Sequence, residues 1–367
     1  MFAKAVQRGV IGLVEDIRLE QRYLRDRTPA YAAILEHIAG ELSGELGNRL
    51  ARAWQERTFF AFYDRPLLLL ASLRLDALCD GPAHPLWSTI GDHATAREPE
   101  AQEIRAALDP SRTRFWDSLA HRAVQTNETT RAVAWLWPAH LMADVDESVP
   151  VHVVDVGTSA GLNLVADDLP LDWVGEDGQP LELLPLPPIA TRLGLDLSPL
   201  DVTDDEAVSW LRACVWPSDA ERLARLNLAI AVFRRAMELG GAPKLETCPI
   251  QAVPARVSEI GRHQRLLVVQ TIMRDYVPAE AWQAYESGLL ALLAERPGGS
   301  MVWMELEVDA QDQQLGSAAV VRAHVADREA NLQTLVLART HPHPRRLFVA
   351  ENAVSELRAA LAAAKMP

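Results

Sequence analysis

Apolar residues in the first 150 positions recur every three or four residues. The spacing holds over residues 10–17, 31–42, 67–78 and 115–123, and no stretch alternates between apolar and polar as a half-buried strand would. This spacing places the apolar side chains on one face of a helix. The pattern therefore predicts an α-helical N-terminal domain over residues 1–149.

After Pro150 the pattern changes to short β-branched runs that alternate with helical segments. Two runs, 151–156 and 265–271, are mainly Val and Leu with a polar residue near the end, as buried parallel strands often are. Segment 169–188 is rich in proline and leucine and predicts an insertion. The alternation predicts an α/β domain over residues 150–367 with a Rossmann-like, mostly parallel sheet. Further strands are predicted at 192–197, 245–248 and 300–306, a closing hairpin at 332–338 with 346–349, and helices at 162–168, 207–213, 220–237 and 280–294.

The net charge and the cysteine spacing limit which kinds of binding partner and cellular compartment we expect. The chain of 367 residues carries 36 Lys and Arg against 50 Asp and Glu, a formal net charge of −14. That charge opposes non-specific binding to nucleic acid and to anionic membranes, so we expect a small-molecule substrate and neither of those partners. Cys79, Cys214 and Cys248 lie far apart without a C-x-x-C pair, which is typical of a reducing compartment. We expect a cytoplasmic protein and leave its oligomeric state open.

A glycine turn follows the first predicted strand. Asp155 and Val156 lead into Gly157-Thr158-Ser159-Ala160-Gly161. No Lys-Ser/Thr follows, which excludes a P-loop, and the spacing is not the G-x-G-x-x-G of dinucleotide sites. The run resembles motif I of Rossmann-like S-adenosylmethionine-dependent methyltransferases, with Ser159 in place of the middle glycine. The alternative is a strand–turn–helix junction that binds no ligand.

Polar residues are predicted at the carboxyl ends of the other strands, where open α/β sheets bind their ligands. Asp196, with Leu197 beside it, ends the second strand, Gln270 ends the fourth and Glu305 the fifth. A carboxylate after the second strand can accept both ribose hydroxyl groups of a nucleoside, which we predict for Asp196. The alternative is that Asp196 caps the following turn. Asp155 is expected to orient the methionine end of the cofactor.

The whole chain resembles a bacterial domain-of-unknown-function family, number twenty-three thirty-two. The resemblance rests on the glycine turn together with the runs Gln125–Glu128, Asp196–Thr203, Val215–Pro217 and His341–His343. Members of that family look like methyltransferases with an additional helical N-terminal domain, which implies S-adenosylmethionine as the cofactor. Within the family Ser159 is the usual residue, whereas the aspartate expected after the third strand is Cys248 here.

The polar run before the sheet and two later segments supply further candidates. Asn127 and Arg131 are predicted to hold the methionine carboxylate, with an N-terminal helix cap as the alternative. His341 and His343 are candidate general bases, because a neutral imidazole accepts a proton from a hydroxyl or amine group. No acid or cysteine lies near them in the sequence, so we expect no metal site.

Asp275 and Tyr276 follow the fourth strand and are candidate substrate-side groups. We predict methyl transfer to a small or medium-sized acceptor, with the N-terminal domain forming a lid over the site. The alternative is a non-catalytic S-adenosylmethionine-binding sensor or scaffold. A nicotinamide enzyme is a third hypothesis.

Overall fold

The computed structural model describes residues 7–92, 97–309 and 319–363. It separates into two units. One comprises Met1–Thr126 and Thr203–Arg225, and the other Asn127–Val202 and Leu226–Pro367. The predicted division between residues 149 and 150 differs from this one in two places. Residues 127–149 group with the sheet because the helix within them packs on its strands, and residues 203–225 group with the helices.

The first unit is built from helices around α4 (Asp64–Asp80). Leucines and alanines fill every side of α4, so the helix is buried almost throughout. A two-residue ladder, β1 (Gln7–Arg8) with β2 (Thr58–Phe59), also occurs here and is too short for its sequence to show alternation. The other helices of this unit are α1 (Leu13–Leu24), α2 (Pro29–Glu41), α3 (Glu45–Ala53), α5 (Trp87–Ile90), α6 (Ala101–Ala107), α7 (Thr113–His121), α9 (Asp205–Ala213) and the 3₁₀ helix η1 (Gly81–Ala83).

The second unit contains an eight-stranded sheet in the order β10-β9-β8-β7-β6-β3-β4-β5. Neighbours from β5 to β7 run parallel, and those from β7 to β10 run antiparallel. The α/β class and the mainly parallel sheet are as predicted. The strands are β3 (Val151–Val156), β4 (Ile189–Asp196), β5 (Lys244–Thr247), β6 (Arg265–Thr271), β7 (Met301–Val308), β8 (Ala319–Ala326), β9 (Leu332–Thr340) and β10 (Phe348–Val349).

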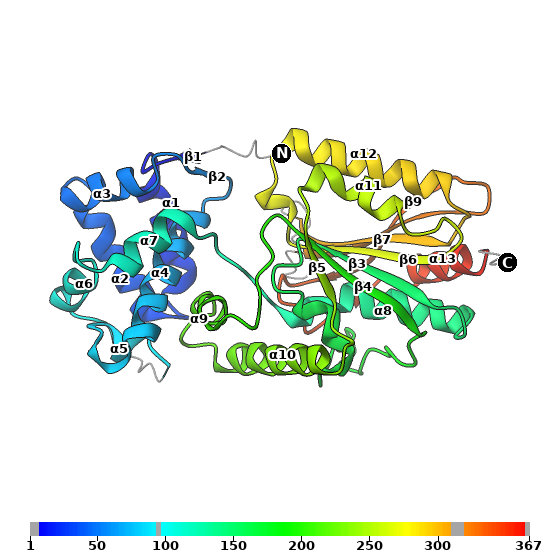
Figure 1. Ribbon diagram of the computed structural model, residues 1–367, viewed down its shortest axis with the longest axis horizontal. Helices are drawn as coiled ribbons and strands as arrows, with labels where there is room; N and C mark the ends of the chain where they lie inside the picture. Colours follow the sequence, from blue (N-terminus) through cyan, green and yellow to red (C-terminus); the bar gives the residue numbers. More distant parts are fainter. Residues whose placement is uncertain (1–6, 93–96, 310–318, 364–367) are drawn as a thin grey trace. The chain divides into compact units, whose positions relative to one another are not determined.

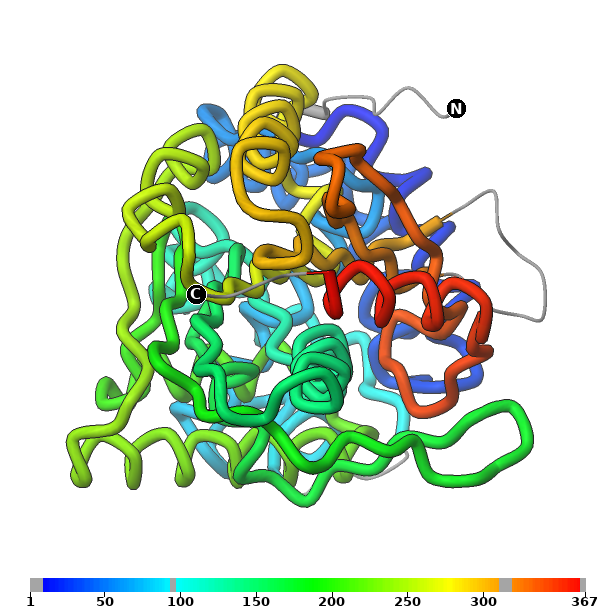
Figure 2. Tube along the Cα trace, turned by 90° about the vertical axis from the view of Figure 1, so that its right-hand side faces the viewer, coloured from blue at the N-terminus to red at the C-terminus, as the bar shows by residue number. Residues whose placement is uncertain are grey.

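Helices cover both faces of this sheet (Figure 1). On one face α11 (Val253–Ser258) and α12 (Ala279–Glu295) pack on β3, β6 and β7. On the other, α8 (Val133–Val145) and α13 (Glu351–Ala362) bury their apolar residues. Figure 2 shows α13, in red, beside α8, and side chains of the two helices belong to one core. The long helix α10 (Ala220–Glu238) runs from the first unit into the second.

The connection from β3 to β4 departs from the prediction. Residues Leu162–Asp168 form a 3₁₀ helix, η3, with a non-helical Val165. In the segment after it, Val174 makes isolated bridges to Pro180 and to Arg346. Trp135 donates a 2.7 Å hydrogen bond to the carbonyl of Asn163, and Arg192 donates to the carbonyl of Leu164. These carbonyls are thereby used by side chains from α8 and β4.

Other short helices complete the second unit: η2 (Thr129–Ala132), η4 (Ile250–Ala252) and η5 (Arg274–Tyr276). In the described part of the chain, no helix combines the length and the hydrophobicity needed to cross a membrane.

Candidate functional site

The carboxyl ends of the parallel strands meet at one edge of the sheet. Val156 pairs with Leu195 of β4 and with Gln270 of β6, and Gln270 pairs with Glu305 of β7. Strand β9 runs in the same direction as β7, because each is antiparallel to β8. The His341–His343 segment that follows β9 therefore emerges at this same edge. The predicted alignment of strand ends is confirmed.

The glycine turn after β3 has three residues in the left-handed region. The φ angles are +73° at Gly157, +55° at Ser159 and +71° at Gly161. A side chain at Gly161 would begin 2.7 Å from Leu245 Cδ2, and one at Gly157 would begin 2.9 Å from Met273 Sδ. At both positions glycine is favoured for two reasons: the φ angle is positive, and a Cβ atom would lie too close to a neighbouring side chain. Ser159 holds the same conformation at a cost of about 1–2 kcal/mol.

Asp196 fastens this turn from the end of β4. One carboxylate oxygen accepts the Ser159 main-chain N–H at 2.8 Å, and the other accepts that of Ser198 at 2.9 Å. The bond to Ser198 is the turn-capping alternative raised from the sequence, and the bond to Ser159 joins two strand ends. Leu197 between them is 73% exposed.

Asp155 lies beneath the turn and is buried. The Thr158 hydroxyl donates to its Oδ2 at 2.7 Å. Burial raises the pKa of Asp155 to about 7, with a smaller contribution from the negative charge of Asp196. In this geometry Asp155 holds the turn through Thr158.

The polar run before α8 reaches the turn through Asn127. Its Nδ2 donates to Ser159 Oγ at 2.8 Å. Arg131 is buried, and its Nε donates to the carbonyl of Pro342 at 2.9 Å. The structure thus brings the polar run, the glycine turn and the His341–His343 segment into one connected group.

Glu128 and His343 form a carboxylate–imidazole pair within that group. Glu128 is buried, and its Oε2 lies 2.9 Å from His343 Nδ1. An ionised carboxylate can only accept, so it selects the tautomer with hydrogen on Nδ1 and leaves Nε2 as the basic nitrogen. The other oxygen of Glu128 accepts from Thr130, so Glu128 itself caps the 3₁₀ helix that follows. The alternative raised from the sequence placed the cap at Thr126 or Asn127 instead. His341 stands 5.7 Å from His343 between ring centroids.

A buried polar network lies behind the ends of β6 and β7, and sequence reasoning found only two of its members. Gln270 is fully buried and donates to Glu305 at 3.2 Å and to Glu307 at 3.0 Å. Its carbonyl oxygen accepts from Tyr285 at 2.6 Å and from Trp303 at 3.1 Å. Both the amide nitrogen and the carbonyl oxygen of the Gln270 side chain are therefore hydrogen-bonded within the protein.

The network extends to β8 and to the loop after β6. His324 Nε2 lies 2.8 Å from Glu305 Oε2, and its ring stacks on Trp303. Glu307 accepts the main-chain N–H groups of Met273 at 3.1 Å and Arg274 at 3.3 Å. Two acids two residues apart in an otherwise apolar strand were the available sequence signal, because both then share one face.

The remaining candidates lie at the margin of this group. Asp275 and Tyr276 are on η5, and Tyr276 is 38% exposed. Cys248 follows β5 and is buried, with its N–H donated to the carbonyl of Asp196 at 2.7 Å. Across residues 7–92, 97–309 and 319–363, no three His, Cys, Asp or Glu side chains gather as metal ligands do.

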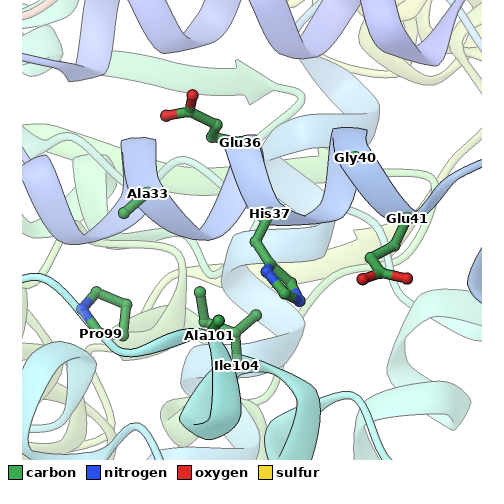
Figure 3. Close-up of a pocket in the computed structure, with 8 residues that line it drawn as sticks. All are labelled: Ala33, Glu36, His37, Gly40, Glu41, Pro99, Ala101 and Ile104. Carbon is green, nitrogen blue, oxygen red and sulfur yellow. The ribbon is translucent and has the colours of Figure 1, made fainter.

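A separate hollow of about 380 Å³ lies on the helical unit between α2 and the segment leading into α6. In Figure 3, His37 and Glu41 point toward Ile104, whereas Glu36 points away from it. Both glutamates are exposed to solvent. The hollow therefore brings no buried catalytic group together, and we place the candidate site at the sheet edge.

Comparison with known proteins identifies one related group. The sequence model of a family described as an uncharacterized protein conserved in bacteria (DUF2332) matches residues 18–348. No curated protein and no solved structure matches the chain. The comparisons support the family resemblance of the sequence motifs and are silent on cofactor and reaction.

Proposed function

We propose that this chain, which belongs to the DUF2332 family of bacterial proteins, binds S-adenosylmethionine at the glycine turn and transfers its methyl group to a small or medium-sized acceptor. The observation that carries the proposal is the turn itself. Three residues in the left-handed region follow the middle parallel strand, and an acid at the end of the next strand holds them. Such a turn lets a ligand approach the main chain closely.

The order of the parallel strands supports a Rossmann-like site. Numbered by their own succession, β5-β4-β3-β6-β7 reads 3-2-1-4-5, which is the doubly wound order. Strand order reverses between β3 and β6, and ligands of such sheets bind outside the strand ends at that point. The glycine turn stands there. The antiparallel strands β8 to β10 extend the sheet beyond this common part.

Each candidate has a proposed role that follows from its contacts. Gly157, Thr158, Ser159 and Gly161 shape the cradle, with Asp155 acting through Thr158. Each oxygen of Asp196 accepts one N–H and has a second lone pair for a ribose hydroxyl. Leu197 is exposed and would pack on the adenine. Gln270 is committed to its network, so it forms a wall of the site.

The polar run and the His341–His343 segment would bind the methionine end of the cofactor and the methyl acceptor. Asn127 and Arg131 are proposed to receive the methionine carboxylate. When bound, the cofactor supplies an electrophilic methyl group on sulfur. His343, oriented by Glu128, would accept the proton of the acceptor's hydroxyl or amine group at Nε2. His341, Asp275 and Tyr276 would contact the acceptor. Holding the two reactants in line supplies most of what such a displacement needs.

Calorimetric titration with S-adenosylhomocysteine tests the cofactor. We expect saturable binding by the wild-type chain and none by Gly157→Val, because the branched side chain would fill the cradle. Circular dichroism establishes that the variant is folded. Absence of binding by the folded wild type at millimolar ligand overturns the proposal. Binding without methyl consumption in a metabolite mixture identifies the alternative, a non-catalytic sensor or scaffold.

A further inference from the structure

Two buried arginines on α4 of the helical unit face different surroundings. Arg65 donates to Asp16 at 2.6 Å and to two main-chain carbonyls. Arg74 is only 1% exposed, and its single hydrogen bond to another described residue goes to the carbonyl of Val215. No carboxylate of the described chain lies within 4.0 Å of its guanidinium group. One buried cation is thus matched by an anion and the other is not.

An unmatched buried guanidinium group is costly. Burying a charge without a partner carries a penalty of several kcal/mol, and arginine cannot shed its proton to avoid it. The Nε of Arg74 is buried and has no acceptor among the described residues. Arg74 therefore lacks a negatively charged partner, and its Nε lacks a hydrogen-bond acceptor, among the described residues.

The side chains of Tyr31 and Cys214, near Arg74, supply no negative charge to balance it. The Tyr31 side chain from α2 is buried beside it, and its hydroxyl has no partner within the described chain. Burial raises the pKa of the Tyr31 hydroxyl, and it raises that of the nearby Cys214 thiol to about 11. Neither is an anion at neutral pH. Arg122 and Arg222 add positive charge near that thiol.

The three groups of the cluster come from separate segments of one unit. Tyr31 is on α2, Arg74 on α4, and Cys214 follows α9. Thr28, just before α2, and Ser218 are joined by a 2.9 Å hydrogen bond between their hydroxyl oxygens. This bond fastens the segment after α9 to the start of α2. The side chains of Tyr31 and Arg74 thus lie in the packed interior of the helical unit.

We propose that the Tyr31–Arg74 cluster binds a small oxyanion, a carboxylate or a phosphate. Such a ligand brings the missing charge and offers lone pairs to both the guanidinium N–H groups and the tyrosine hydroxyl. A buried water molecule would satisfy the hydrogen bonds and leave the charge unmatched. The site lies within the helical unit and does not depend on cofactor binding at the sheet.

Thermal unfolding of the full chain at neutral pH tests this site. Sodium phosphate and sodium acetate are compared with sodium chloride at equal ionic strength. We expect at least one oxyanion to raise Tm in proportion to the logarithm of its concentration above Kd, by on the order of 2–5 °C for each tenfold increase. Arg74→Met should abolish the rise, and Tyr31→Phe should at least halve it.

Arg52→Gln is the matched control. It removes one positive charge from the same unit at an exposed position on α3 and should keep the full response. No rise in Tm beyond that in chloride, or an unchanged rise in Arg74→Met, overturns the proposal. If Arg74→Met does not fold, the response of Tyr31→Phe decides alone, and an undiminished rise refutes the site.

Discussion

Two polar clusters at the same edge of the sheet are held together in different ways. In the glycine turn, Asp155 and Asp196 accept from groups on residues 158, 159 and 198, which are close to them along the chain or across one strand pair. In the network around Gln270, the partners are side chains on β7, β8 and α12. The turn depends on main-chain conformation, whereas the network depends on strand register.

This difference has an energetic consequence. A main-chain turn tolerates loss of one side chain if its φ angles remain accessible. It does not tolerate replacement of a glycine at positive φ by a residue that disfavours that conformation. A buried network tolerates isosteric exchange but not removal of a member, since the remaining buried partners are then left without a hydrogen bond. Substitutions can therefore distinguish the two clusters, because each is destabilised by a different kind of change.

The largest effect is expected for Gly161→Val. The substitution forces a β-branched residue to φ +71° and places its Cβ 2.7 Å from Leu245 within the packed interior. We expect a loss of about 3–5 kcal/mol in the free energy of unfolding, measured by urea denaturation. Gly157→Ala should lose less, because its nearest neighbour is the flexible end of Met273. Equal losses would show that packing around the turn does not matter.

A smaller effect is expected from the pH dependence of Glu307. Burial raises its pKa from the ordinary 4.5 to about 7, so its protonated form favours the folded state. That stability is complete below pH 4.5 and is lost as pH rises to about 7, by about 3 kcal/mol at most. Glu307→Gln imitates the protonated acid, and its unfolding free energy should fall less across this window than that of the wild type.

Chemical denaturation at pH 4.5, 6 and 7.5 measures that difference. Asp155 and Glu20, whose pKa values burial also raises to about 7, remain in both proteins. Only the difference between the two proteins therefore reports on Glu307. Parallel pH profiles of wild type and variant would contradict the assigned burial of this carboxyl group.

The smallest effect is expected for Asp196. Asp196→Ala removes the acceptor of two main-chain N–H groups and should cost about 1–3 kcal/mol in urea denaturation. Asp196→Asn retains one acceptor oxygen and should cost less. If the asparagine variant keeps its stability yet loses affinity for S-adenosylhomocysteine, the carboxylate has a ligand role beyond fastening the turn. Unchanged affinity in both variants would restrict Asp196 to capping.

The sequence allowed the turn to be predicted and left most of the network unseen. Strands 151–156 and 265–271 were predicted with the observed bounds, because their apolar runs are bounded by polar or turn residues. β8 was missed, since Arg322 and His324 interrupt its apolar run. The α13 helix was missed as well. His324 could not be assigned to a site without the β7–β8 pairing that sets it beside Glu305.

The α-helix predicted at residues 162–168 is a 3₁₀ helix for a similar physical reason. Their sequence has a helical pattern, but Trp135 and Arg192, distant along the chain, take up carbonyls of that segment. The pairing of Glu128 with His343 spans the greater part of the second unit and was likewise beyond reach of local patterns. Contacts of this kind arise only once the strands are in place.

The discontinuity of the helical unit affects the order in which the protein can be made. Its interior includes Trp210, Leu211 and Val215 from the returning segment Thr203–Arg225. A ribosome releases β3 and β4 before that segment. Part of the interior of the helices synthesised first therefore stays uncovered while two of the five parallel strands emerge. A gene fragment ending at residue 149 would leave that interior permanently incomplete. To produce the helical unit on its own, residues 203–225 would have to be connected to residues 1–126 by a linker.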